Sequence, residues 1–271
     1  MNTAPRHRLL ELAAESSRDW LRAARMWRLW TALGFEDLIE RYRRTFFGVT
    51  WLVVSFAVFI LVYMLVFGHG SGLSTADYAL YVTIGFGAWN FMASIVGESC
   101  TSYTSSGNWI QGTSIPYPVF ILQTLYRNWL VFLLTIAVVI VAMLWLEEHW
   151  NAGMLWALPG LLVYVITPLW LIAILAPLCA RWHDLHHAVQ TGMRLLFFAT
   201  PILWIPAQRA QLQVLAYWNP LTYFIDIVRA PLLGDGLPVQ SWIVVGVVNA
   251  IGLVAGWITY TLTRHRVVFW L

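Results

Sequence analysis

The sequence predicts an all-α integral membrane protein with six transmembrane helices, an N-terminal amphipathic interface helix, and short periplasmic gate helices between the fifth and sixth spans. Three observations predict this class. Of the 271 residues, 60% are hydrophobic and only 11% are charged, whereas soluble domains carry roughly 25% charged residues. Six apolar segments follow one another, and about 18 apolar residues suffice for a helix to cross the bilayer. Arginines gather on one side of these segments, which sets their direction.

The N-terminal region, residues 1–48, is rich in arginine and lacks the apolar core of a cleavable signal peptide. We therefore expect it to stay in the cytoplasm and remain attached. Within it, Asp19–Trp30 fits a helix at about 100° per residue. One face carries Trp20, Ala23, Ala24, Trp27 and Trp30, and the other carries Arg18, Arg22, Arg25 and Arg28. This pattern predicts an amphipathic helix on the membrane surface, whose arginines face lipid headgroups or a protein partner.

The predicted spans cover about residues 49–68, 78–97, 128–146, 154–180, 188–206 and 241–263. The first span directly follows the basic cluster Arg41–Arg44, which places the N-terminus inside. Six spans then return the C-terminal tail, residues 264–271, to the cytoplasm. The sixteen basic residues are all arginine. In this orientation, all of them except Arg209 and Arg229 lie on the cytoplasmic side or at cytoplasmic helix ends. This bias supports the orientation.

Two spans carry additional signals. The fifth contains Arg194 and is interrupted by Pro201 and Pro206, so we expect Arg194 to face the protein interior or the interface rather than lipid. The sixth contains a GxxxG pattern, Gly252 to Gly256, which permits close helix approach. The pattern leaves open whether the neighbouring helix belongs to the same subunit.

Two connecting segments are candidates for function. Residues 98–118 form a cytoplasmic loop rich in Ser, Thr, Asn and Gln, which could fit a cleft of a partner with Asn108, Trp109 and Gln111 as anchors. The alternative is a hydrated loop. Residues 207–240 are unusually apolar, and Asn219-Pro220 is a helix-start pattern ahead of a short helix with Asp226 and Arg229 at i, i+3. Two short elements hinged at Asn219-Pro220 and dipping into the outer leaflet are predicted, and the alternative to a functional role is a lid that packs the bundle.

Aromatic residues form two faces. On the first span Phe56, Phe59, Tyr63 and Phe67 fall within about 80° of one another, and on the fifth Phe197, Pro201 and Trp204 form a similar face. Aromatic rings stack on the apolar faces of sugars, so a sugar-binding surface is one interpretation. Aromatic residues also pack membrane helices and form interface belts. Both interpretations stay open.

Several chemistries are disfavoured. The chain has no lysine and hence no phosphate-binding loop, so ATP and Mg²⁺ would have to bind another polypeptide. No nucleic-acid-binding module is visible. Cys100 and Cys179 are isolated and are interpreted as packing residues. A membrane-embedded enzyme using His183, His186 and His187 is one alternative, but this cluster lacks a convincing fourth metal ligand, and we predict neither a catalytic nor a metal site.

The motifs RYRRTFFGVTW, ARWHD, FFATPILW, YWNPLTYFIDIVR and RHRVVFWL occur in this order between Arg41 and Leu271. In this combination the chain resembles the membrane subunit of ABC-2 type exporters, and most closely the permeases that export O-antigen and related lipid-linked polysaccharides. The resemblance implies a half-transporter in the bacterial inner membrane, which forms a homodimer and binds two copies of a separate ATPase subunit. An ABC-2 exporter of a small drug or lipid is the alternative within the same architecture.

The resemblance also implies roles for particular segments. The interface helix of the family would match Trp20, Arg22, Arg25 and Trp27, and its coupling helix would lie within 98–118. Its gate helices would match Leu212–Leu233. The gate residues implied in this way are Trp218, Asn219, Pro220, Tyr223, Asp226 and Arg229. The polymer path would run along the aromatic face of the first span.

Overall fold

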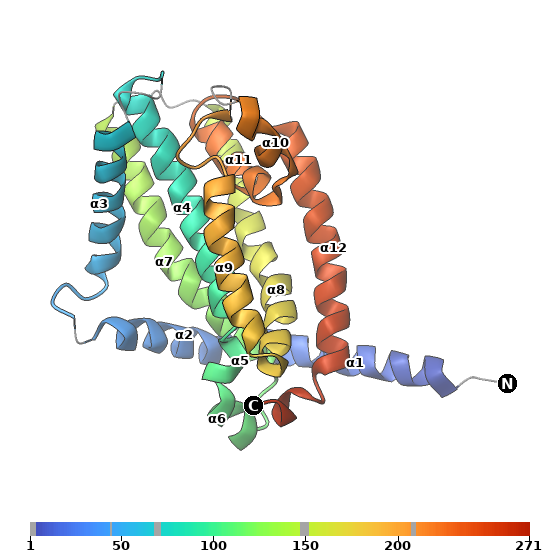
Figure 1. Ribbon diagram of the computed structural model, residues 1–271. Coiled ribbons are helices and arrows are strands. Elements are labelled where there is room, and N and C mark those ends of the chain that lie inside the picture. Colours follow the sequence, from blue (N-terminus) through green and yellow to red (C-terminus); the bar gives the residue numbers. More distant parts are fainter. Residues whose placement is uncertain (1–3, 44, 68–71, 147–151, 207–209) are drawn as a thin grey trace.

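The computed structural model of the protein is built from helices (Figure 1). It describes residues 4–43, 45–67, 72–146, 152–206 and 210–271. Within these residues, four helices are long and apolar enough to cross a membrane: Thr75–Ser99, Pro118–Trp145, Ala152–Arg181 and Val239–Thr263. A shorter apolar helix covers Thr50–Val66. The predicted all-α, multi-pass membrane architecture is confirmed at this level.

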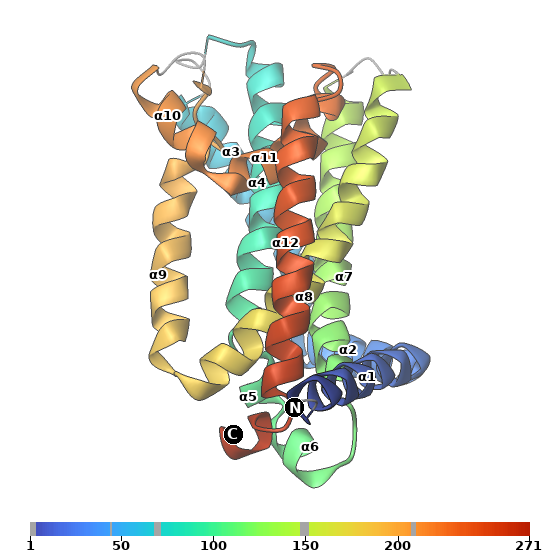
Figure 2. The ribbon, with the colours of Figure 1, turned by 90° about the vertical axis from the view of Figure 1, so that its right-hand side faces the viewer.

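The long elements are α1 (Ala4–Arg25), α2 (Trp27–Tyr42), α3 (Thr50–Phe67), α4 (Thr75–Ser99), α7 (Pro118–Trp145), α8 (Ala157–Arg181), α9 (Asp184–Ala199) and α12 (Val239–Thr263). The short ones are α5 (Ser102–Ser105), α6 (Gly107–Gly112), η2 (Ala152–Trp156), α10 (Ala210–Trp218), α11 (Pro220–Leu232) and η4 (Val267–Phe269). We call the end of the bundle that carries α1, α2, α5, α6 and the C-terminal tail the base (Figure 1). Helices α10 and α11 lie at the opposite end (Figure 2).

The two N-terminal helices lie across the base, steeply inclined to the bundle helices (Figures 1 and 2). Met26 separates them, with ψ of 33° instead of about −42° in a regular helix. The continuous helix predicted over Asp19–Trp30 is therefore interrupted. As a result its predicted apolar face is not uniform, because Ala23 is fully buried and Trp27 is 55% exposed.

Two helix ends differ most from the predicted span ends. Helix α7 starts at Pro118 instead of residue 128, with the proline in its first turn, where a missing N–H costs nothing. Helix α9 ends at Ala199, whereas the predicted span ran to residue 206. Thr200 takes an extended conformation, with φ −94° and ψ 135°, as expected for the residue before Pro201. The fifth apolar segment is therefore helical only over its first part.

The glycine pattern on α12 packs against α8 of the same chain. A Cβ on Gly252 would lie 2.4 Å from the ring of Trp170, and one on Gly256 would lie 3.0 Å from the Trp170 Cα. Asn249 on the same face accepts a hydrogen bond from the Trp170 indole at 2.9 Å. The two glycines thus make room for a tryptophan that is also hydrogen bonded across the interface.

Candidate functional site

The aromatic face of α3 points toward α4. The ring of Phe59 stacks on Phe86 of α4 with centroids 3.6 Å apart, and Phe56 stacks on the same ring at 5.6 Å. Tyr63 packs against Phe59 at 4.4 Å. The side chain of Phe67 lies outside the described residues. In this single chain the described part of the stripe therefore contacts a neighbouring helix.

Helix α4 joins the two predicted aromatic faces. Phe197 of α9 makes edge contacts with Phe86 at 6.3 Å and with Trp89 at 5.6 Å. Sequence reasoning missed Phe86 and Trp89, although their i, i+3 spacing places them on one face of α4. Trp204 lies beyond the end of α9, and its indole donates to the Phe198 carbonyl at 3.2 Å.

A cavity of ≈ 330 Å³ borders the aromatic cluster between α3, α4 and α7. Phe56, Phe59 and Phe86 line it together with other apolar residues, and five polar side chains complete the lining. The polar lining residues are Ser55, Asn90, Ser94, Asn128 and Thr135. Rings and hydrogen-bonding groups around one cavity form a surface that suits sugar chemistry better than bare hydrocarbon does.

A partly buried ion network ties α2 to α4 and α7 at the base. Glu98 accepts bonds from Arg41 at 2.7 Å, from Arg127 at 2.8 Å and from Asn128 at 2.5 Å. Arg127 also pairs with Asp37 of α2 at 2.7 Å. Burial alone would lower the pKa of Arg41, but the Glu98 carboxylate raises it, so the guanidinium stays charged. One carboxylate thus holds three helices together.

A second network ties α1 to the end of α12. Arg264 pairs with Asp19 at 2.9 Å and with Glu15 at 3.1 Å. The Tyr260 hydroxyl donates to Asp19 at 2.9 Å, and its ring meets Trp20 edge-on at 6.0 Å. These contacts span most of the sequence, so no local pattern could have revealed them.

The predicted coupling anchors lie on the exposed side of α6. Asn108, Trp109 and Gln111 are exposed, and Ile110 between them is buried at 4% and fixes the helix. A cavity of ≈ 380 Å³ is lined by Trp109 together with Asp37 and Arg41 of α2 and Arg127 of α7. The structure therefore brings the predicted anchors beside α2.

The N-terminal anchors are placed differently from one another. Arg22, Arg25 and Trp27 are exposed, whereas Trp20 is half-buried against Tyr260. The break at Met26 accounts for this difference, since Trp20 and Trp27 belong to separate helices.

The predicted gate residues form the α10–α11 hairpin. Asn219 caps α11 by accepting from the Leu221 N–H at 3.0 Å, and its amide donates to Thr200 at 2.7 Å. Pro220 occupies the first turn of α11, as predicted. Tyr223 donates to the Tyr217 carbonyl at 2.7 Å. Trp218, at 78% exposed, points away from the packed core.

Asp226 and Arg229 have other partners than the i, i+3 pattern indicated. Asp226 accepts from Ser241 of α12 at 2.6 Å. Arg229 is 5% exposed, donates to the Pro201 carbonyl at 2.7 Å and lies over the Tyr81 ring at 4.1 Å. Tyr81 also donates to the Pro201 carbonyl at 3.1 Å. These bonds satisfy the backbone where α9 ends, as a break inside a membrane protein requires.

Replacing Asn219 with alanine is expected to loosen the hairpin. It removes the α11 cap and a buried bond to Thr200, together worth roughly 1–3 kcal/mol. Hydrogen exchange should therefore speed up in the first turn of α11. Asn219→Asp keeps the cap and loses only the donated bond, so it should give an intermediate rate. Gln213→Ala removes one exposed bond to Pro206 and serves as the control. Equal exchange in all three variants would contradict this role.

The histidine cluster lies at the start of α9. His183 is the residue before the helix, and the rings of His186 and His187 are 5.6 Å apart. Among the described residues, no group of three or more His, Cys, Asp or Glu side chains could hold a metal ion. Cys100 and Cys179 are both buried.

Comparison with known proteins gives a consistent result. Residues 28–233 match the ABC-2 type transporter family. Two O-antigen export system permease proteins RfbA of Klebsiella pneumoniae are 28% and 26% identical over 170 residues, which is 62% of this chain and 66% of theirs. The aligned part is thus slightly less than two thirds of those relatives. The RfbA protein of Myxococcus xanthus is 24% identical over 207 residues, 74% of this chain and 79% of that protein.

The family match covers most of the helical bundle, from α2 through α11. It includes the α2 network, the aromatic cluster and the α10–α11 hairpin. The resemblance stated from the motifs is therefore confirmed, and it favours a transporter subunit over the membrane-embedded enzyme. The chain belongs to the ABC-2 type transporter family.

Proposed function

We propose that the chain is the permease subunit of an ATP-driven exporter, which moves a lipid-linked polysaccharide from the cytoplasm to the periplasm. Two copies form a homodimer in the bacterial inner membrane, with the base and both termini in the cytoplasm, and each copy docks one ATPase subunit that binds ATP and Mg²⁺. Six spans, α3, α4, α7, α8, α9 and α12, cross the bilayer. The names of the relatives support the polymer class.

One observation carries this proposal: the outward side of α9 carries polar and charged side chains in addition to apolar ones. No residue of α9 is buried. His187, Thr191 and Arg194 are exposed on it together with Leu195 and Phe198. Arg194 lies ten residues beyond Asp184, about 15 Å along the helix. An arginine at that depth is costly in lipid, so this side of α9 should face water or protein. A second copy of the chain, separated from α9 by a water-filled path, provides both water and protein.

The other candidate sites can each be given a role in such an exporter. The exposed anchors on α6 and the neighbouring α2 network offer a docking surface for the ATPase, and the two ion networks connect that surface to three bundle helices, α4, α7 and α12. The aromatic cluster around Phe86 and its cavity lie inside the same bundle, where loose stacking on sugars suits a sliding polymer. The α10–α11 hairpin closes the opposite end as a gate.

Substitutions at Arg194 test the proposal. In a strain lacking the permease, polymer should accumulate in the cytoplasm, and the wild-type gene should restore export. Arg194→Leu should reduce export at least about tenfold, since it removes the charge from the wet path, whereas Arg194→Lys should retain most of it. Surface polymer on immunoblots is the measurement. If α9 faces lipid, Arg194→Leu will be tolerated, because leucine is favourable there.

Two further measurements address the partners. The purified permease should retain the cognate ATPase in both Arg194 variants. A Thr191→Cys variant should form a disulfide between two copies on mild oxidation. Leu162→Cys on the outward side of α8 should not form one. Absence of an ATPase complex, together with no polymer accumulation in the deletion strain, would refute the proposed function.

A further inference from the structure

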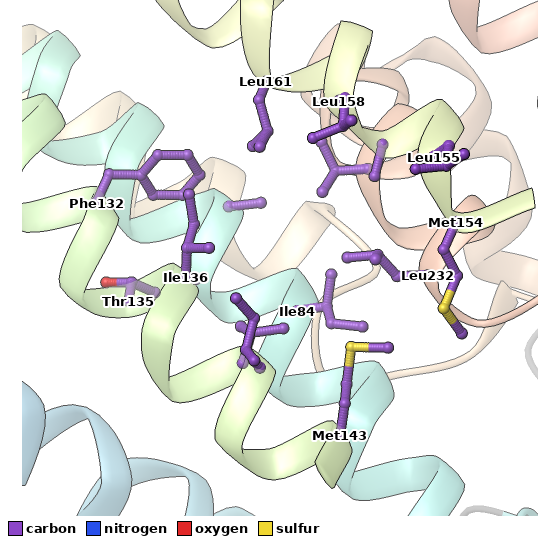
Figure 3. A pocket seen from close by; sticks show the side chains of 16 residues that line it. Ile84, Phe132, Thr135, Ile136, Met143, Met154, Leu155, Leu158, Leu161 and Leu232 are labelled. Carbon is purple, nitrogen blue, oxygen red and sulfur yellow. The ribbon is translucent and has the colours of Figure 1, made fainter. Parts of the chain in front are cut away.

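A largely apolar cavity of ≈ 300 Å³ lies between α4, α7, α8 and α11 (Figure 3). Ile84 of α4 and Leu161 of α8 lie on its walls, with Leu232 of α11 beside them. From α7 come Ile136 and Met143. Its lining is almost entirely carbon, apart from methionine sulfurs and the hydroxyl of Thr135 (Figure 3).

The cavity offers almost nothing to a polar ligand. The Thr135 hydroxyl is already directed to the Val131 carbonyl of its own helix at 3.4 Å. The lining residues carry no ionisable group. A water molecule needs two to four polar partners, and apolar cavities of this kind stay dry and take up apolar ligands. The occupant must therefore be hydrocarbon.

The mouth of the cavity opens where hydrocarbon is available. Leu155 and Leu158, at 64% and 58% exposed, and Ile140, at 43%, belong to both the lining and the outer surface. They lie on two of the helices that are apolar and long enough to cross a membrane. Two tryptophans are close in sequence to the residues at this mouth: Trp145 is 83% exposed and Trp156 is 51% exposed. Exposed tryptophans are typical of a membrane interface. Bilayer acyl chains therefore border the opening.

Helix α4 lies between the cavity and Phe197 of α9, while Phe132 and Thr135 of α7 line both this cavity and the one beside the aromatic cluster. At about 100° per residue, Ile84 and Ala88, which line the cavity, fall on the face of α4 opposite Phe86 and Trp89, which contact Phe197 of α9. A ligand in the cavity thus comes from the surrounding bilayer and not from the side of α9.

We propose that this cavity binds one acyl chain of a bilayer phospholipid, from the leaflet nearer the α10–α11 hairpin. The chain fills the space, while the headgroup stays at the interface near Trp156. Because Val228 and Leu232 of α11 line the cavity, the bound chain packs between that helix and the α7–α8 pair. The lipid thereby supports α11 in its position.

Photo-labelling tests this site. The permease is placed in nanodiscs that contain phosphatidylethanolamine with a diazirine in the middle of one acyl chain, and labelled residues are identified by mass spectrometry. Label should concentrate on cavity residues such as Met143 and Ile136 and be weaker on Leu162, an exposed residue of α8 outside the cavity. An excess of unlabelled phospholipid should compete.

Variants that place a larger side chain in the cavity provide the control. Ala157→Phe should lower labelling of the cavity at least about fivefold, because the ring takes the volume that the chain needs. Ile136→Phe fills the cavity from α7 and keeps the test valid if the first variant is unstable. Leu162→Phe is the matched change on the lipid-facing side and should leave labelling unchanged. Label spread evenly over exposed apolar residues, no effect of either filling variant, or competition by polyprenyl phosphate instead of phospholipid would each overturn the proposal.

Discussion

Replacing Glu98 with alanine is expected to destabilise the base more than any other single truncation there. Arg127, whose side chain is only 13% exposed, would lose its main carboxylate and keep only Asp37. Leaving a buried charge with no partner costs about 3–5 kcal/mol, and because Asp37 remains, the loss should lie near the lower end of this range. Thermal unfolding of the purified protein in detergent should show a clearly lower midpoint. Export should also fall, because α2 would no longer be tied to α4.

Three variants separate this effect from a general loss of charge. Arg41→Gln removes the exposed side of the network, since the Arg41 side chain is 50% exposed, and should cost at most about 1 kcal/mol. Glu36→Gln changes an exposed glutamate on α2 and should be neutral. Glu98→Gln keeps the shape and one acceptor and should be intermediate. If Glu98→Ala and Glu36→Gln behaved alike, the network would not hold the base together.

Replacing Gly256 with valine is expected to separate α8 from α12. A Cβ there would lie 3.0 Å from the Trp170 Cα and 3.2 Å from its carbonyl oxygen. These are backbone atoms, which cannot turn aside as a side chain can. Overpacking costs about 1–3 kcal/mol even when side chains can adjust, so the loss here should reach at least the upper end of that range. The unfolding midpoint and the yield of folded protein measure it.

Gly246 on the same helix provides the control. A Cβ at Gly246 meets no atom within 4 Å, so Gly246→Ala should be neutral or slightly stabilising through helix propensity. Gly252→Ala should be intermediate, because its Cβ would meet the Trp170 ring and a ring can shift by a small rotation. A smaller companion change, Trp170→Leu, should partly rescue Gly252→Ala. Equal stability of the Gly246 and Gly256 variants would contradict this packing.

Helix existence could be predicted well, and helix ends less well. Apolar length alone identified the segments that became α3, α4, α7, α8 and α12. The end of α9 at Ala199 and the start of α7 at Pro118 were missed, although each is set by a nearby proline. The hydropathy of a window changes gradually, whereas a proline ends or begins a helix at one residue.

For the candidate sites too, local features could be predicted from the sequence and long-range contacts could not. The exposure of Trp109 and the cap at Asn219 follow from local patterns, namely a polar segment and an Asn-Pro pair. The partners of Arg229 do not follow from its spacing, because Asp226 lies at i, i+3 whereas Pro201 and Tyr81 are the contacts. Phe86 was overlooked because it is an isolated ring within an uncharged segment.

The sequence by itself determined that this chain belongs in a membrane, how its main apolar helices are distributed, and which family it resembles. These properties depend on composition and on neighbours within a few residues, where transfer free energy and helix periodicity act. Only the tertiary structure decided which groups meet: Glu98 with Arg127, Tyr260 with Asp19, and Gly256 with Trp170. Such pairs join segments far apart in the chain, and their energy depends on shape and hydrogen-bond geometry that exist only after the helices have packed.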